Sequence, residues 1–142
     1  MYHEINRESM ETLGWYAHCV PSGDNTPYGY NYHTHGMEHS FKHPNIQIVL
    51  PIDFVAAHNI AYAIVEKIRK GVRFEANIDY KGIMENDYLI RFIDAKECGR
   101  SVLRLLIPDK NGKYEGEFAA QLTMLDSNDG LPDDEKIYHQ ID

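Results

Sequence analysis

Histidine is concentrated in one part of this chain. Five of its eight histidines lie within or just before residues 28–51. They are His18, His33, His35, His39 and His43. Imidazole binds transition metals and titrates near neutral pH, where it serves as a general acid or base. The sequence therefore predicts that the functional site lies in or beside this stretch.

Metal binding is the first chemistry that the spacing suggests. His33 and His35 would share one face of a strand, and His39 and His43 follow at four-residue steps. With Glu38 they would suit zinc or iron if the loop folded back. Histidines in a polar loop are more often solvated side chains, and the glycine at position 36 disfavours a helix there. The prediction therefore names no metal and no cofactor.

Acid–base or nucleophilic catalysis is the second possibility. The hydroxyl of Thr34 beside the imidazole of His43 could act as a nucleophile with its base. His35 or His43 could also serve as a general acid or base. The structural alternative is that Thr34 satisfies a strand end while His43 caps the loop before Pro44. Thr34, His35 and His43 are the catalytic candidates.

Ligand binding is the third possibility. Tyr28, Tyr30 and Tyr32 would form an aromatic platform, and Gly36 would let a ligand approach the backbone closely. Arg73 and Arg91 would supply positive charge for a phosphate or a carboxylate. The alternative is that the tyrosines are the core face of a sheet and the arginines belong to surface ion pairs.

These residues predict binding of a small anionic or nucleotide-like ligand in a pocket lined by Tyr, His and Arg. A phage protein that sequesters a host signal or metabolite would fit this description. Two alternatives stay open: a hydrolase or lyase that acts on such a ligand, and a protein-interaction module of the inhibitor or immunity type. The expected partner is a small molecule, with a homodimer as a further alternative because small binding domains often place sites at a two-fold interface.

The elements that position these residues follow from local patterns. Apolar residues recur at helical spacing over 53–70, with Asp53 as N-cap and Gly71 as terminator. A short helix is expected at 1–13, ended by Gly14. Strands are expected at residues 15–20, 28–35, 46–50, 72–76, 88–95, 101–107 and 118–125. The Asn-Gly at 111–112 predicts a type I′ hairpin turn. Runs of strands with one main helix predict a single α+β domain with a mostly antiparallel sheet.

Composition limits the classes of protein to consider. The chain has 142 residues and a net charge of −8, which argues against nucleic acid as the main partner. Residues 1–125 are expected to form one domain, followed by an acidic tail at 126–142. No apolar run is long enough for a membrane helix, and the first residues do not resemble a signal peptide. Cys19 and Cys98 have no metal-type spacing, so a reduced, cytoplasmic setting is expected.

Several of these positions match a known family. The matching residues are Gly14, Trp15, Tyr32, Thr34, Gly36, His43, Pro44, Gly71, Arg73, Phe74, Arg91, Phe92, Pro108, Asp109 and Gly112. In their order and spacing the chain resembles the bacterial and phage family called domain of unknown function 4262. It departs from that pattern at Asn45, between Ala95 and Val102, and at Ile107. The resemblance implies a fold and a site region and no activity.

Overall fold

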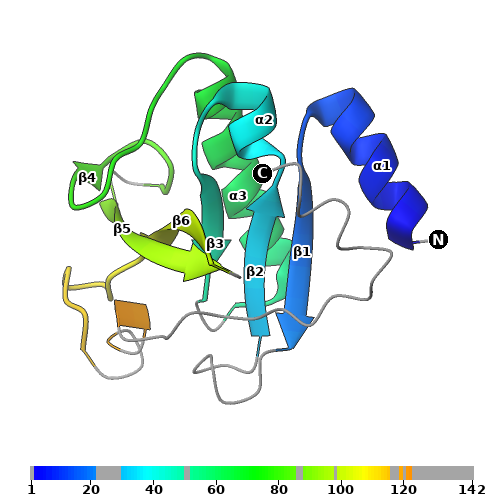
Figure 1. Cartoon of the computed structure of the whole chain (residues 1–142). Helices are drawn as coiled ribbons and strands as arrows, with labels where there is room; N and C mark the ends of the chain where they lie inside the picture. Colours follow the sequence, from blue (N-terminus) through cyan, green and yellow to red (C-terminus); the bar gives the residue numbers. More distant parts are fainter. Residues whose placement is uncertain are drawn as a thin grey trace.

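One six-stranded sheet organises the chain (Figure 1). The computed structural model describes residues 2–21, 30–49, 52–85, 88–97, 99–115, 119 and 121–122. Its elements are α1 (Tyr2–Leu13), β1 (Tyr16–Pro21), β2 (Tyr30–His35), α2 (Met37–Phe41), β3 (Asn45–Ile48), α3 (Phe54–Arg69), β4 (Asp79–Tyr80), β5 (Ile90–Glu97) and β6 (Arg100–Leu106). The strand order is β1-β2-β3-β6-β5-β4, and β3–β6 is parallel while the other described pairs are antiparallel. The predicted α+β class is confirmed.

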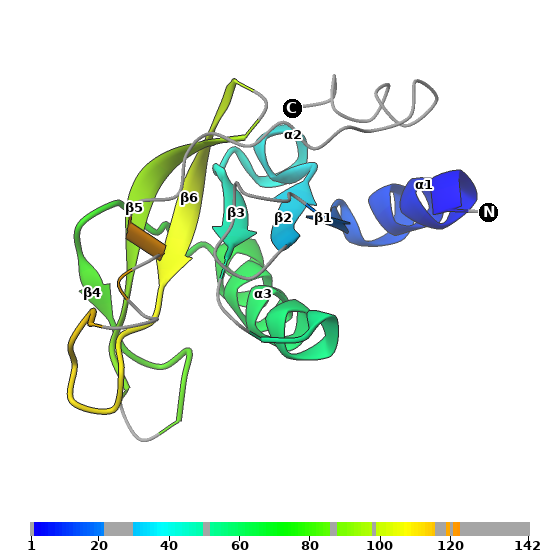
Figure 2. The same cartoon turned by 90° about the horizontal axis from the view of Figure 1, so that it is seen from below.

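Helix α3 covers one face of the sheet, and α1 lies beyond the β1 edge (Figures 1 and 2). The Asp53 carboxylate accepts a hydrogen bond of 2.8 Å from the Ala56 amide, which satisfies one of the free N–H groups at the helix start. The residues that face the sheet are Ala57, Ala61, Ile64, Val65 and Ile68, all buried. They are the residues whose spacing predicted this helix, and the prediction is confirmed.

The sheet has an apolar face and a polar face because side chains alternate along each strand. Tyr32 belongs to the core cluster that α3 covers, together with Ile46, Ile48, Leu103 and Leu105. His33 and His35 alternate with Tyr32 and therefore lie on the opposite face. In β1 the side chain of Ala17 packs against the core, so its neighbours Tyr16 and His18 lie on the polar face.

Helix α2 occupies the segment that was expected to be a loop. Gly36 begins it with φ 97°, and Lys42 ends it in the left-handed conformation with φ 55°. The Asn45 side chain accepts a hydrogen bond of 3.2 Å from the Met37 amide, and Ser40 Oγ donates to the Gly14 carbonyl at 2.6 Å. These contacts come from outside the helix, so five residues suffice to form it. The expectation that Gly36 would disfavour a helix is wrong, because this glycine stands before the first turn.

The segment after α3 differs most from expectation. Residues 72–76 form no strand, because the Phe74 amide donates to the imidazole of His43 and is not available to a ladder. The turn near residue 111 is not type I′. Its closing bond runs from the Gly112 amide to the Asp109 carbonyl at 2.9 Å, and Asn111 has no positive φ. The described part of 118–125, at 119 and 121–122, is a short 3₁₀ turn and not a strand. The predicted tail at 126–142 lies outside the described residues.

A spanning helix needs about 20 predominantly apolar residues. None of the described helices meets the length and hydropathy that crossing a membrane demands.

Candidate metal centre

Three buried histidines meet on the polar face of the sheet. His18, His33 and His35 each offer a ring nitrogen, and these nitrogens all lie within 4.8 Å of one another. The ring centroids are 5.3 Å apart for His18 and His33 and 4.8 Å apart for His33 and His35. His33 and His35 are fully buried, and His18 is 9% exposed. These three residues form the histidine cluster.

Strand pairing brings the cluster together. His18 on β1 is the direct cross-strand partner of His33 on β2. Paired residues in an antiparallel ladder point to the same face, and residues two apart in a strand do so too. His35 therefore joins the same face. Tyr16 is the cross-strand partner of His35, and its ring stacks on the imidazole at a centroid distance of 4.9 Å. This stacking limits the rotation of His35.

The spacing of the three nitrogens is close to what a metal ion requires. At a Zn–N distance of about 2.05 Å, tetrahedral ligand nitrogens lie about 3.3 Å apart. The three ring nitrogens lie within 4.8 Å of one another, so binding of an ion would draw them together toward that separation. Three imidazoles on zinc leave a fourth position for water or a ligand, which is the arrangement of catalytic zinc sites. Iron, nickel and copper also accept imidazole.

A row of paired residues continues from the cluster across the sheet. His33 pairs with Gln47 on β3, and Gln47 pairs with Arg104 on β6. Arg104 Nε donates to Gln47 Oε1 at 2.7 Å, and Arg104 Nη1 donates to the Gln121 carbonyl at 2.9 Å. Gln47 and Arg104 are both buried. A polar side chain and a fixed positive charge thus lie beside the histidine cluster.

The other catalytic candidates hold the fold together. The Thr34 hydroxyl donates to Asn45 Oδ1 at 3.0 Å and accepts from the Ile46 amide at 2.9 Å. His43 Nδ1 donates to the Pro44 carbonyl at 2.8 Å, and Nε2 accepts from the Phe74 amide at 3.1 Å. Burial lowers the pKa of His43, and the Arg73 guanidinium lowers it further. Both ring nitrogens of His43 are engaged in its neutral form.

The ligand-binding candidates are spread over the molecule. Tyr32 is in the core, and Gly36 starts α2. Arg73 donates to the carbonyls of Ile68, Val72 and Phe41, which fastens the end of α3 to α2. Arg91 pairs with Asp79 at 2.8 Å on the exposed side of β5. Tyr30 starts β2, and its side chain lies outside the described part. Of the predicted site residues, His35 belongs to the histidine cluster, as does His33 from the predicted metal set.

A second histidine environment lies on the helix face. The Tyr32 hydroxyl and His58 Nδ1 are 2.8 Å apart, and the rings of Phe54 and Trp15 both stack with the imidazole of His58. Burial raises the pKa of Tyr32, with Cys19 adding to the effect, and burial lowers the pKa of His58. These directions keep both groups neutral, as expected of a structural hydrogen bond at the edge of the core.

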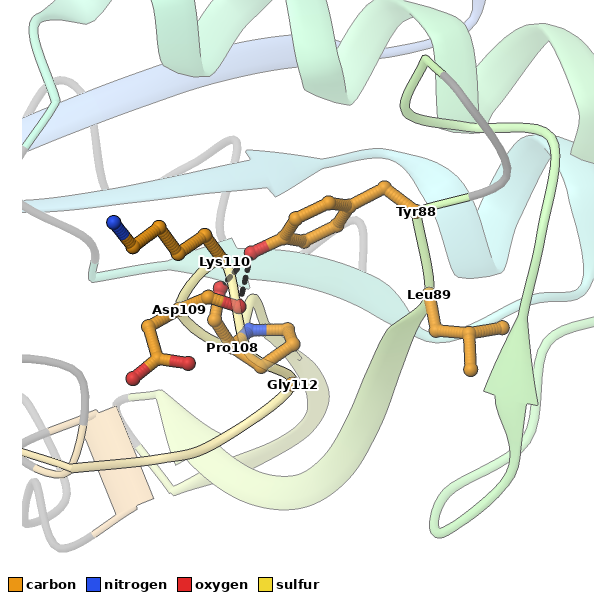
Figure 3. Close-up of a pocket in the computed structure, with 6 residues that line it drawn as sticks. All are labelled: Tyr88, Leu89, Pro108, Asp109, Lys110 and Gly112. Carbon is orange, nitrogen blue, oxygen red and sulfur yellow. Dashed lines mark hydrogen bonds between the residues drawn. The ribbon is translucent and has the colours of Figure 1, made fainter.

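A shallow surface pocket of about 230 Å³ lies beside the turn that follows β6 (Figure 3). It is lined by Tyr88, Leu89, Pro108, Asp109, Lys110 and Gly112. The Tyr88 hydroxyl points at the backbone and donates to the carbonyls of Pro108 and Asp109. The Asp109 carboxylate accepts from the amides of Asn111 and Lys113. These polar groups stabilise the turn itself, and the pocket is smaller than typical ligand sites.

His18 was predicted to lie beside the site but was not among the predicted metal ligands, and Gln47 and Arg104 were not predicted as site residues. His39, a predicted metal candidate, is exposed on α2 and lies outside the histidine cluster. The signal for His18 was its alternation with Ala17 and Cys19 in β1, but only the register with β2 sets it opposite His33. No family model, no curated protein and no solved structure matches this chain.

Proposed function

We propose that this chain binds one divalent transition-metal ion, zinc in the first place, through His18, His33 and His35. The observation that carries the proposal is the convergence of three buried imidazole nitrogens within 4.8 Å. A single metal ion can bond to all three imidazole nitrogens at once. The open coordination position then takes the small anionic or polar ligand that the sequence leads us to expect.

Turnover is the alternative on the same site. A zinc ion with three protein ligands lowers the pKa of its bound water to about 7 and so supplies a hydroxide nucleophile. Hydrolysis of the bound ligand would follow from that chemistry. The resemblance to the uncharacterised bacterial and phage family stays a prediction, as do the homodimer and the role in sequestering a host molecule.

Metal titration tests the proposal directly. Chelator-treated protein is titrated with Zn²⁺ by calorimetry, and the bound metal is counted by elemental analysis. We expect one zinc per chain. His18→Gln and His33→Gln should weaken zinc affinity by more than about 100-fold, because each removes one of three ligands. His39→Gln is the matched control, since it removes an exposed histidine outside the cluster.

Two results would count against the metal centre. Zinc affinity that is the same in His18→Gln, His33→Gln and wild type would place any bound metal elsewhere. Absence of stoichiometric binding in the folded wild type would remove the proposal. Circular dichroism of each variant separates loss of a ligand from loss of the fold.

A further inference from the structure

The outer edge of β5 is open over the second half of the strand. The sheet ends on this side with β4, away from α1 (Figure 2), and β4 pairs with Ile90 and Arg91. Next to them, the Phe92 carbonyl accepts a hydrogen bond of 2.7 Å from the Asn77 amide. In the part of the chain that the structure describes, no strand pairs with this edge over residues 94–97. An unpaired edge is a template for another strand.

The hydrogen bond at Phe92 shows which backbone groups face outward. In an antiparallel ladder the N–H and C=O of one residue point to the same side, and successive residues alternate. Because the Phe92 carbonyl points away from β6, the N–H and C=O of Asp94 and Lys96 point outward too. The groups of Ala95 point the opposite way, toward its partner Val102 on β6. Asp94 and Lys96 are both exposed, so their backbone groups are accessible to a further strand.

Asp94 and Lys96 also make this edge complementary to itself. If two copies pair antiparallel about a two-fold axis at Ala95, Asp94 of each copy lies opposite Lys96 of the other. The outward backbone groups of these residues then face one another, and the small side chains of the two Ala95 residues meet at the axis. An axis at residue 94 or at residue 96 would instead set two like charges directly opposite, which is unfavourable. Charge therefore selects one register.

We infer that two copies of this chain associate edge to edge through β5 and form one continuous sheet with its two-fold axis at Ala95. The inference does not rest on the metal site, which lies on β1 and β2 toward the other end of the sheet. The contact uses the same edge of both copies, so association stops at the dimer. Lys96 Nζ donates to Ser101 Oγ at 3.0 Å within one copy. An ammonium has three N–H donors, so Lys96 can also bond to Asp94 of the second copy.

Sedimentation velocity measures the association. Two charge pairs and a short ladder make a small contact, and interfaces below about 1,200 Å² are commonly transient, so the wild type is followed up to about 0.5 mM. We expect a reversible monomer–dimer equilibrium. The dimer should weaken as the salt concentration rises, because the charge pairs are exposed.

Charge reversal tests the register. Asp94→Lys and Lys96→Asp each set two like-charge pairs in the contact, so each should weaken the dimer at least about ten-fold. When the two variants are mixed in equal amounts, they should form a heterodimer about as tight as the wild-type dimer, because every facing pair is again Lys with Asp.

Glu11→Lys is the matched control for Asp94→Lys. It makes the same change in net charge at an exposed position on α1, beyond the opposite edge of the sheet (Figure 1). The chain carries a net charge of −8, so either substitution reduces the overall repulsion between two copies. Net charge alone would therefore make both variants associate more tightly. Only the proposed register makes Asp94→Lys associate more weakly.

The outcomes decide the inference without reference to the metal. Weaker association of both single variants, recovery in their mixture and no weakening in Glu11→Lys support it. A wild type that stays monomeric over the whole concentration range overturns it. Unchanged affinity in Asp94→Lys and Lys96→Asp, or weakening without recovery in the mixture, overturns it as well, because association would then use another surface or register. Zinc titration of the same samples tests the metal centre separately.

Discussion

At the scale of single residues, neighbours decide what each imidazole can do. His43 has a carbonyl on one ring nitrogen and an amide on the other, which fixes one neutral tautomer. His58 stacks with two aromatic rings and has a tyrosine hydroxyl at Nδ1. His33 has other imidazoles as its ring neighbours. Only the last environment collects several metal-ligating nitrogens.

His43 should make stability depend on pH. Burial, with the charge of Arg73, holds the pKa of His43 in the folded state below its ordinary value of 6.5. Protonation at Nε2 would also set an N–H against the Phe74 N–H that this nitrogen accepts from. The unfolded chain therefore binds the proton first. The free energy of unfolding should fall as the pH drops below about 6.5 toward the lower pKa of the folded state. His43→Gln should show a smaller fall.

Urea unfolding between about pH 7.5 and about pH 5 measures this difference. His43→Ala should in addition lose about 2 kcal/mol at neutral pH, because the buried Phe74 amide loses its acceptor. Parallel pH curves for wild type and His43→Gln would show that His43 does not contribute to the acid sensitivity.

Some of the site could be predicted at this scale and some could not. The alternation in β2 correctly separates Tyr32 from His33 and His35. It says nothing about which residue of β1 stands opposite, because a shift of one residue in register turns every side chain to the other face. Gln47 and Arg104 are 57 residues apart in sequence, so no local pattern connects them.

At the scale of elements, the junction between α1 and β1 packs closely on the start of α2. A Cβ placed on Gly36 would lie 2.8 Å from the Gly14 carbonyl oxygen and 2.5 Å from Met10 Sδ. The φ of 97° at Gly36 is also unfavourable for any residue with a side chain. Glycine is therefore required here for two independent reasons, backbone conformation and close approach.

Gly36→Ala should destabilise the fold by about 3 kcal/mol, from about 1 kcal/mol of backbone strain and about 2 kcal/mol of steric overlap. Gly71→Ala is the matched control: its φ is 105°, and nothing lies within 4 Å of an added Cβ. It should cost only the strain, about 1 kcal/mol. Chemical denaturation of both variants measures the difference, and equal losses would mean that the contact with Gly14 and Met10 relaxes freely.

Elements with strong local signals are the ones that the sequence predicts. Helix α3 has an N-cap, an apolar stripe and a terminating glycine within its own residues, and it forms as expected. Helix α2 depends on Asn45 and on the Gly14 carbonyl, which are partners from outside the helix, and it was missed. The strand expected at 72–76 fails for the same kind of reason, since the imidazole of His43 takes the Phe74 amide.

At the scale of the whole molecule, the core cluster and the candidate metal site lie on opposite faces of the sheet. One face carries the apolar residues that α3 covers, and the other carries the histidine cluster, Gln47 and Arg104. The run of strands correctly predicted a mostly antiparallel sheet. It could not predict the parallel pairing of β3 with β6, because that pairing depends on where the chain returns after α3, β4 and β5.

The parallel pair of β3 and β6 also sets a kinetic order for folding. Pairs β1–β2 and β5–β6 close short loops, whereas β3 and β6 join residues 57 apart, at a larger entropic cost. The β3–β6 pair should therefore form late. Ile46→Val, in the β3–β6 pair, should mainly accelerate unfolding. Phe92→Leu, in the β5–β6 pair, should mainly slow refolding. Stopped-flow measurements distinguish the two, and a nucleus built on β3–β6 would reverse them.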